Sequence, residues 1–376
     1  MVDKVEAIDD YTVKFTLSKP YPLFLTYTQQ VPIVNEKFVN EHKRDISKVA
    51  SGTGPYKLVS YDPAVKVILT ANKDYRLGPA AIKDVELRYV SDASSGVVAL
   101  ETGEINFMTV PPVLSGRLLA NKKLTNQKTL PLYTAVIAMN TKVKPFDNKL
   151  VRQAFTIAAD KQGICDIAYE GSCTVAKLQA YTNSFGVDLS GIPDFSYNPE
   201  KAKKLLAEAG YPNGMNLTKD FKIKLLTIPG TFHEKVGQVF QKNLADIGVI
   251  AELQNTQTPD EDVESGNFAI MNQGATYRSD FSYNECNYGT VGIGGNNYSQ
   301  FSDPYIDKMF AKGNVETDPA KRKVIYKELI NYIADLALGI PVFHKQEIYV
   351  WSGDLNAKAH DSGMFPFFVY EWSWKE

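Results

Sequence analysis

Histidine, the side chain most often used for acid–base catalysis and metal binding, occurs four times in this sequence of 376 residues. None of the four lies in an HExxH pattern or at i,i+4 spacing from another metal-ligand residue, the spacing that puts two ligands on one helix face. We expect His233, beside Glu234 on an amphipathic helix, to face solvent. We expect His344, beside Lys345 at a strand end, to lie at the surface. The histidines therefore indicate no metal site.

Patterns for a serine nucleophile or a phosphate-binding loop are also missing. Neither GxSxG nor GxxxxGK[ST] occurs. The glycines of residues 289–295 form a glycine-rich loop without a following lysine, so a flexible connector is favoured over a phosphate site. Carboxylates are plentiful but scattered. The sequence gives no support for a catalytic centre, although an enzyme with dispersed residues stays an alternative.

The three cysteines allow one disulfide. Cys165 and Cys173 are eight residues apart around Gly171, where a helix is expected to give way to a loop. They could pair in an oxidising compartment or remain two free thiols. Cys286 is left over and no CxxC pair exists, so neither a zinc site nor a thioredoxin-like site is indicated.

The elements that must position these residues begin with β-structure. Apolar and polar residues alternate over residues 5–17, which predicts a hairpin that turns at residues 9–10 and buries one side. A helix is expected over residues 94–103, where a glycine ends it. Further strands are expected near residues 57–61, 65–71, 85–90 and 105–108.

Residues 146–160 are the most distinctive segment of the chain. They follow an apolar strand over residues 132–140 and a break at Pro145. Asp147 or Asn148 is expected to cap a helix. Its apolar residues fall on one face at helical spacing. These residues are Leu150, Val151, Ala154, Phe155 and Ala158.

The second half of the chain alternates strands with helices. Asn198 and Pro199 mark the start of a helix and Gly210 its end. A strand at 223–228, a helix at 233–247 and a strand at 249–253 give a β-α-β rhythm, which predicts an α/β domain. Residues 276–297 lack periodicity and are expected to form a functional or irregular loop. Further helices are expected to begin at Asp303 and Asp318, and further strands at residues 341–343 and 348–351.

Composition narrows the class of protein. Basic and acidic residues nearly balance, 41 against 43, which argues against a nucleic-acid binder. Hydrophobic residues make up 44% and aromatic residues 11%, enough for a large core. No apolar run approaches the roughly 20 residues that span a bilayer. At about 150 residues per domain, two or three domains are expected.

Several blocks, in order, resemble the family 5 extracellular solute-binding proteins, the receptors of oligopeptide, dipeptide and nickel ABC importers. The segment 146–160 is similar to the signature region of that family. The resemblance spans nearly the whole chain, from the hairpin at residues 6–13 to Ile340-Pro341. The other blocks are residues 52–56, 72–75, 101–105 and 198–211, then Asn297-Tyr298, Asp307, Arg322 and Tyr326.

The resemblance implies an α/β fold of the periplasmic-binding-protein type II, with two lobes around a hinged cleft. Family members are longer. We therefore expect an N-terminally truncated chain without its signal segment, in which lobe I and domain II are incomplete. The implied domains are residues 1–42 as a remnant of small domain II, 43–130 as part of lobe I, 131–342 as domain III (the second jaw of the cleft), and 343–376 as the return to lobe I.

The implied function is capture of a small solute by cleft closure and its delivery to ABC permease subunits, without catalysis. A peptide is the expected solute. A receptor for a nickel chelate or another solute, a ligand-presenting sensor and a hydrolase are alternatives. No cofactor, no resident metal and no nucleic-acid partner is expected. The full-length protein is expected in the periplasm or outside the cell, with membrane contact only through the transporter or a lost lipid anchor.

The same resemblance implies a ligand-binding segment. In peptide-binding members an aromatic residue three positions before an aspartate marks a cleft segment, and the aspartate grips the peptide's α-ammonium group. Tyr277 and Asp280 match this pattern, with Tyr where the family usually has Trp, and Arg278 and Phe281 belong to the same segment. A buried cation needs a carboxylate, and such a charge-assisted hydrogen bond is roughly twice as strong as a neutral one. For Asp280 the alternative is a loop acid or helix cap. Arg278 could anchor a peptide carboxylate or form a surface ion pair.

Two more residues complete the expected site. Tyr133, on the strand that enters domain III, is a cleft candidate, with core packing as the alternative. Asn297 ends the loop of residues 276–297 and could line the mouth of the cleft, with ordinary turn chemistry as the alternative.

Overall fold

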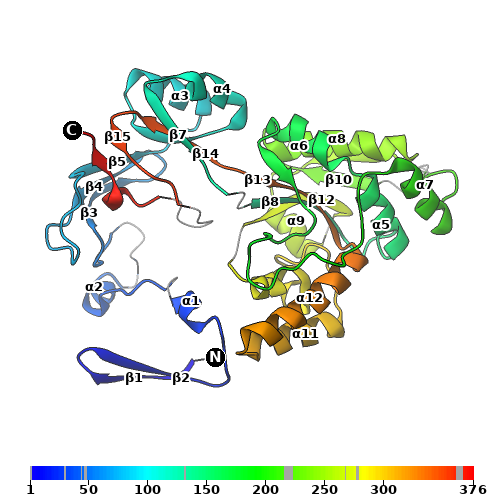
Figure 1. The fold of residues 1–376 in the computed structure, drawn as a ribbon, viewed down its shortest axis with the longest axis horizontal. Coiled ribbons are helices and arrows are strands. Elements are labelled where there is room, and N and C mark those ends of the chain that lie inside the picture. The colour runs from blue at the N-terminus through cyan, green and yellow to red at the C-terminus, as the bar shows by residue number, and fades with distance from the viewer. Residues whose placement is uncertain are drawn as a thin grey trace. The chain divides into compact units, whose positions relative to one another are not determined.

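The computed structural model (Figure 1) describes residues 2–28, 31–43, 45, 49–130, 133–215, 223–266, 268–276, 279–360 and 367–376. The chain divides into two compact units. Unit 1 comprises Met1–Phe24 and Pro131–Lys345, and unit 2 comprises Leu25–Leu130 and Gln346–Glu376. The assignment of these units to lobes and domains stays a prediction.

Unit 1 is built on a mixed sheet of six strands in the order β11-β10-β12-β8-β13-β9. β10 pairs in parallel with β11 and β12, and β8 pairs antiparallel with β12 and β13. β8 is buried along almost its whole length, which explains why its sequence is a run of apolar residues. The strands are β8 (Tyr133–Met139), β9 (Cys173–Val175), β10 (Ile223–Thr227), β11 (Ala251–Asn255), β12 (Ile270–Thr276) and β13 (Gly339–Lys345).

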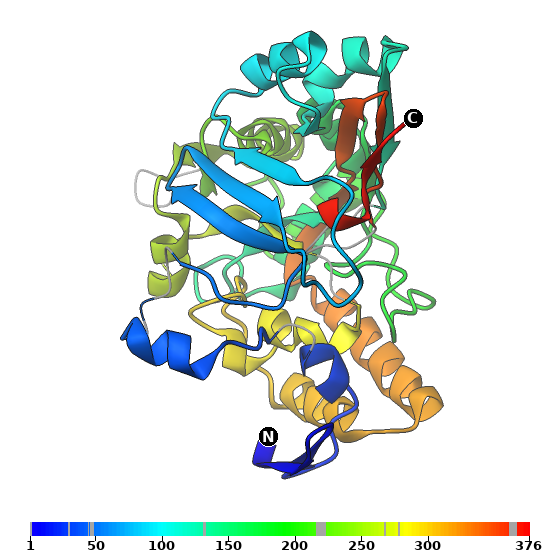
Figure 2. The ribbon, with the colours of Figure 1, turned by 90° about the vertical axis from the view of Figure 1, so that its left-hand side faces the viewer.

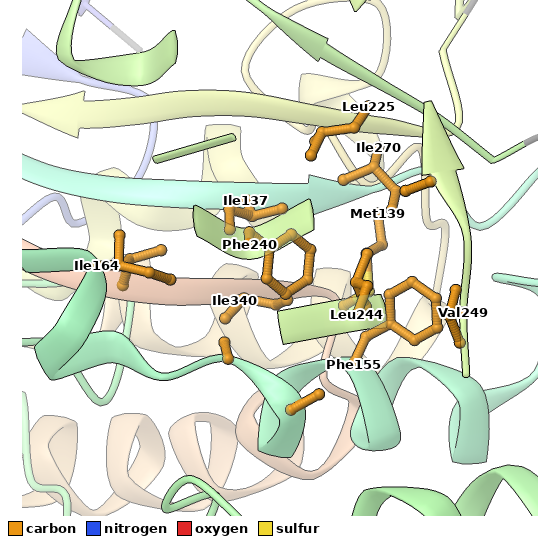
Figure 3. Close-up of a cluster of buried hydrophobic side chains, with 14 of the residues drawn as sticks. Ile137, Met139, Phe155, Ile164, Leu225, Phe240, Leu244, Val249, Ile270 and Ile340 are labelled. Atoms are coloured by element: carbon orange, nitrogen blue, oxygen red, sulfur yellow. The ribbon is translucent and has the colours of Figure 1, made fainter. Parts of the chain in front are cut away.

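Four helices share one hydrophobic core with this sheet (Figure 3). Phe155 and Phe240 come from two of these helices and share this core with Ile137 of β8 and Ile340 of β13. All four side chains are fully buried. The predicted signature helix is confirmed. Its cap is Asn148, whose side chain accepts a hydrogen bond from the Leu150 N–H. The helices are α5 (Lys149–Ala158), α6 (Lys161–Tyr169), α7 (Pro199–Glu208) and α8 (Phe232–Asp246).

A second core of unit 1 lies around α11 (Pro304–Val315) and α12 (Pro319–Leu336), which lie side by side in Figures 1 and 2. The predicted starts are confirmed, since Asp303 caps α11 and Asp318 caps α12. The segment expected to be an irregular loop contains short helices, and its described residues range from buried to exposed. The short helices of this segment are η1 (Phe281–Asn284), α10 (Glu285–Tyr288) and η2 (Thr290–Gly292), and α9 (Pro259–Ser265) precedes β12.

Unit 2 contains two three-stranded sheets, β3-β4-β5 and β6-β14-β7, and the short pair β15-β16. Helix α4 and strand β7 were not predicted, because their sequences show weak periodicity. The strands are β3 (Tyr56–Asp62), β4 (Lys66–Ala71), β5 (Asp84–Arg88), β6 (Phe107–Val110), β7 (Leu124–Lys128), β14 (Ile348–Ser352), β15 (Leu355–Asn356) and β16 (Ser373–Trp374). The helices are α1 (Phe24–Thr28), α2 (Glu36–Glu41), α3 (Ala93–Thr102), α4 (Pro112–Ala120) and η3 (Val369–Glu371).

The N-terminal hairpin forms as predicted, with β1 (Val2–Asp9) paired to β2 (Thr12–Leu17). Its predicted buried side is wrong for this chain. Val5 and Val13 are each 56% exposed, and Phe15 is 43% exposed. Alternation predicted the strands correctly, but the described residues supply little that covers the apolar face.

Two questions that the sequence left open have answers in the structure. Cys165 of α6 and Cys173 of β9 form a disulfide, with their Cα atoms 6.2 Å apart. Among the described residues, no helix combines the length and the apolar character that crossing a membrane requires.

Candidate functional site

The predicted ligand-binding segment is only partly described. Tyr277 and Arg278 lie outside the described residues, so their roles stay predictions. Asp280 is 3% exposed and caps η1, where its carboxylate accepts a hydrogen bond of 2.9 Å from the Ser282 N–H. The cap that the sequence allowed as an alternative is therefore present, but it is buried.

Asp280 forms a buried two-pronged ion pair with Arg322 of α12. Nη1 of Arg322 donates to Oδ2 of Asp280 at 2.7 Å, and Nη2 donates to Oδ1 at 2.8 Å. Both side chains are 5% exposed. The guanidinium lies 5.1 Å from the centre of the Phe185 ring and 5.0 Å from that of Tyr326, and Nε donates to the Gly313 carbonyl. Burial alone would lower the pKa of Arg322, but the hydrogen bonds and charge of Asp280 and Tyr326 raise it overall.

This geometry gives Asp280 partners within the protein, and its predicted role in gripping a peptide ammonium stays a prediction. Both carboxylate oxygens already accept hydrogen bonds, and a guanidinium neutralises the charge that was expected to meet a peptide ammonium. The pair ties the loop before η1 to helix α12. Phe281 is fully buried and stacks on Phe310 with ring centres 5.8 Å apart, so it packs in the second core of unit 1, and its predicted ligand contact stays a prediction.

Asn297 is likewise an interior residue. It is fully buried, and its amide donates to the carbonyls of Gly289 and Phe301 at 3.0 and 2.9 Å. Its side-chain oxygen accepts from the Ser299 hydroxyl at 2.7 Å. Both amide N–H groups thus fix the loop, and the expectation that Asn297 lines the mouth of a cleft stays a prediction. The next residue, Tyr298, is half-buried and close enough to Tyr133 to influence its ionisation.

Tyr133 lies at the end of the sheet where the chain enters unit 1. It stands in register with Lys345 of β13 and Thr276 of β12. Its ring covers Gly274, where a Cβ atom would collide with it, so β12 needs a glycine at this point. Burial raises the pKa of the Tyr133 hydroxyl, and the Tyr298 hydroxyl adds to the effect, so the phenol stays protonated near neutral pH. Its half-buried ring also packs against the core, so both uses considered for Tyr133 stay open.

Four further side chains surround Tyr133, and together the five form what we name the edge cluster: Tyr133, Tyr169, Phe232, His233 and Lys345. Nζ of Lys345 lies 4.7 Å from the centre of the Tyr133 ring, 5.5 Å from Phe232 and 5.9 Å from Tyr169. These distances are within the range of cation–π attraction. Tyr133 and His233 approach through the hydroxyl and Nε2, 3.3 Å apart. The cluster brings aromatic faces, a hydroxyl and the Lys345 ammonium together at the end of the sheet.

The two histidines expected at the surface are buried, so those predictions are wrong. His233 is 7% exposed, and burial lowers its pKa to about 4 against a smaller opposing effect of the Asn272 side chain. His344 is 5% exposed, and burial lowers its pKa to about 4 as well. Its Nδ1 lies 2.8 Å from the Thr134 hydroxyl. Both imidazoles are therefore neutral near pH 7.

The contacts of the described residues do not join Tyr133 to the Asp280 segment. Sequence reasoning missed Lys345, Phe232 and His233 as companions of Tyr133. One sequence signal was available. Thr231 caps a helix, which places Phe232 and His233 together in its first turn. In the described part of the chain, no group of three or more His, Cys, Asp or Glu side chains is placed to hold a metal ion.

Comparison with known structures defines the class of protein. The substrate-binding protein CtaP of an ABC transporter from Listeria monocytogenes superimposes with a TM-score of 0.88 over 99% of this chain and 78% of that chain, at 23% identity. The α/β fold of the type II periplasmic binding proteins, predicted from the sequence, is confirmed.

The family follows from the sequence match. Residues 1–293 match the model of the bacterial extracellular solute-binding proteins, family 5 Middle, and the chain belongs to this family. The glutathione-binding protein GsiB of Pectobacterium atrosepticum is 28% identical over 344 residues, 87% of this chain and 65% of that protein. Heme-binding protein A of Haemophilus influenzae is 26% identical over 357 residues, 92% of this chain and 65% of that protein. The chain thus spans just under two thirds of both relatives.

Proposed function

We propose that this chain is the solute-capturing part of an ABC importer receptor that works outside the cytoplasmic membrane. The observation that carries the proposal is the family match over residues 1–293. Solute would be captured by closure of the cleft and passed to the permease subunits, and it would leave chemically unchanged. Related binding proteins support a receptor over the alternative of a hydrolase.

We further propose that the solute is a peptide or a peptide-like molecule. Glutathione, bound by a relative that aligns with 87% of this chain, is itself a small peptide. The edge cluster supports the proposal, because its aromatic faces suit the apolar side chains of a peptide. Heme or a nickel chelate is the second candidate, and the alignment of a heme-binding protein with 92% of the chain is the observation that favours heme.

Thermal unfolding with a panel of solutes tests the proposal. Glutathione and di- to hexapeptides should raise the melting temperature, because a solute present at 100 times its Kd stabilises the folded state by about 2.7 kcal/mol. Mass spectrometry after incubation should recover the peptides intact. Stabilisation by heme or nickel–histidine alone would replace the peptide assignment. Peptide cleavage that scales with protein concentration would contradict the receptor role.

A further inference from the structure

A small cavity lies inside unit 1, beside the central sheet. Its volume is about 30 Å³. A buried water molecule needs about 10–15 Å³. Strands β8 and β13, helices α6 and α12 and the segment of residues 177–179 all contribute to the lining. The cavity therefore has room for a water molecule or for one ion of similar size.

The charge around this cavity is positive. In the described part of the chain, the charged residues that line it are Lys161 and Lys177. Lys161 is the first residue of α6 and is half-buried, and its Nζ atom donates to the Ala176 carbonyl across a long 3.4 Å. Burial lowers the pKa of Lys161 to about 8, with the charge of Asp194 opposing the effect, so the ammonium is still charged at pH 7.

Asp194 is the acidic residue that acts on this ammonium, but it is exposed and is not part of the lining. Its carboxylate accepts hydrogen bonds from the N–H and the hydroxyl of Ser196, at 3.0 and 2.5 Å. Asp194 therefore reduces the positive potential of the cavity from outside and does not cancel it.

Gln179 adds a donor without an acceptor to the same cavity. Its side chain is 8% exposed, and its Nε2 atom is buried without a hydrogen-bond partner among the described residues. Native structures rarely leave a buried N–H group unpaired, because the lost hydration is costly. Tyr288 also lines the cavity, and burial raises the pKa of its hydroxyl, which therefore keeps its proton. The polar groups at the cavity are thus mainly hydrogen-bond donors.

We infer that this cavity binds a small monovalent anion of the size of chloride, held by the Lys161 ammonium and the Gln179 amide. The inference goes beyond the proposed solute capture and does not depend on it. A water molecule would satisfy the amide but would leave the charge of Lys161 in place, whereas an anion satisfies the amide and offsets the charge. The volume suits a monatomic ion better than the larger phosphate.

A bound anion would strengthen one corner of unit 1. Lys161 belongs to α6, and Gln179 lies shortly after β9. The disulfide between Cys165 and Cys173 joins the same helix to the same strand. An anion held between Lys161 and Gln179 would add a second link beside this disulfide. Because the anion binds the folded protein, it should stabilise that state by mass action.

Thermal unfolding in sodium chloride and in sodium gluconate, at equal ionic strength, tests the inference, because gluconate is too large for the cavity. At ten times its Kd, chloride should raise the melting temperature by roughly 3–6 °C relative to gluconate. Lys161→Met and Gln179→Leu should each remove most of this rise. Asp194→Asn should shift the rise to lower chloride concentrations, because it removes the negative charge that acts on Lys161.

Lys224→Met is the matched control for general salt effects. It removes an exposed lysine from β10 of the same unit and should respond to chloride as the wild type does. Equal melting temperatures of the wild type in the two salts would overturn the inference. A chloride-dependent rise that persists undiminished in folded Lys161→Met and Gln179→Leu would overturn it as well.

Crystals grown in sodium bromide locate the ion directly. Bromide is close to chloride in size, and its anomalous scattering should appear beside Nζ of Lys161 and Nε2 of Gln179. A water molecule at this position, without anomalous signal, would overturn the anion site. The receptor role would be unaffected, since binding of peptides is measured separately.

Discussion

Replacing Asp280 by asparagine separates two roles that one carboxylate could have. Asparagine keeps the size of the side chain but removes the charge that faces Arg322. Both side chains are 5% exposed, so the guanidinium would remain buried without its counter-charge. Removing one partner of a buried ion pair costs about 3–5 kcal/mol. We therefore expect Asp280→Asn to lower the free energy of unfolding by roughly that amount.

The loss should be visible in thermal unfolding. Domains of about 150–250 residues lose roughly 2–4 °C of melting temperature for each kcal/mol. Unit 1 has about this size, since it includes Pro131–Lys345. Asp280→Asn should then melt roughly 6–20 °C below the wild type. Adding Arg322→Met should recover part of the loss, because the double variant no longer buries an unpaired charge.

An exposed ion pair of the same unit is the matched control. Oδ2 of Asp188 lies 2.9 Å from Nζ of Lys327, and the side chains of Asp188 and Lys327 are 47% and 45% exposed. Asp188→Asn should change the stability far less than Asp280→Asn, because solvent screens an exposed pair. The reasoning is refuted if Asp280→Asn costs as little as this control. It is also refuted if the variant keeps its stability but binds free-amine peptides more weakly, with N-acetylated peptides unaffected. That pattern would restore the ammonium-gripping role.

Three further predictions concern stability. The folded-state pKa of His344 is about 4 and the unfolded value is about 6.5, so the unfolded chain takes up the proton first as the pH falls. The contribution of this residue to the free energy of unfolding should therefore be complete above about pH 6.5 and should decline by about 3 kcal/mol toward pH 4. Urea unfolding at a series of pH values measures this decline, which should be shallower for His344→Gln. Reducing the disulfide between Cys165 and Cys173 should cost about 2–3 kcal/mol, and a Cys→Ala double variant should not respond to reductant in urea unfolding. Gly274→Ala should cost about 1–3 kcal/mol, because the added methyl group displaces the Tyr133 ring, and the cost in thermal melts should shrink in a Tyr133→Ala background.

Local signals in the sequence predicted most of the fold. Asn148 and Asn198, each before a run of apolar residues at helical spacing, placed the starts of α5 and α7 correctly. Capping depends on contacts two or three residues away, so sequence alone contains the information. The exposed face of the N-terminal hairpin was not predictable in this way. Alternation shows which side of a strand is apolar, but not whether anything in the chain covers it.

The candidate site was harder to predict, because local sequence does not show which distant elements cover a side chain. His233 and His344 were expected at the surface because their immediate neighbours are charged. Their burial is decided by strands and helices far away in the sequence, such as Thr134, which lies 210 residues from His344. Long-range packing of this kind has no local signature.

Two of the cations of unit 1 that lie against aromatic rings show why residue type alone does not define a binding site. Arg322 and Lys345 both lie against aromatic rings. The Arg322 guanidinium donates hydrogen bonds to the Asp280 carboxylate and to the Gly313 carbonyl, and these bonds stabilise the fold. The family resemblance pointed to Asp280, because in peptide-binding members an aspartate three positions after an aromatic residue grips an ammonium group. That inference described the right chemistry, but the cation that Asp280 binds is supplied by the protein, 42 residues further along the chain.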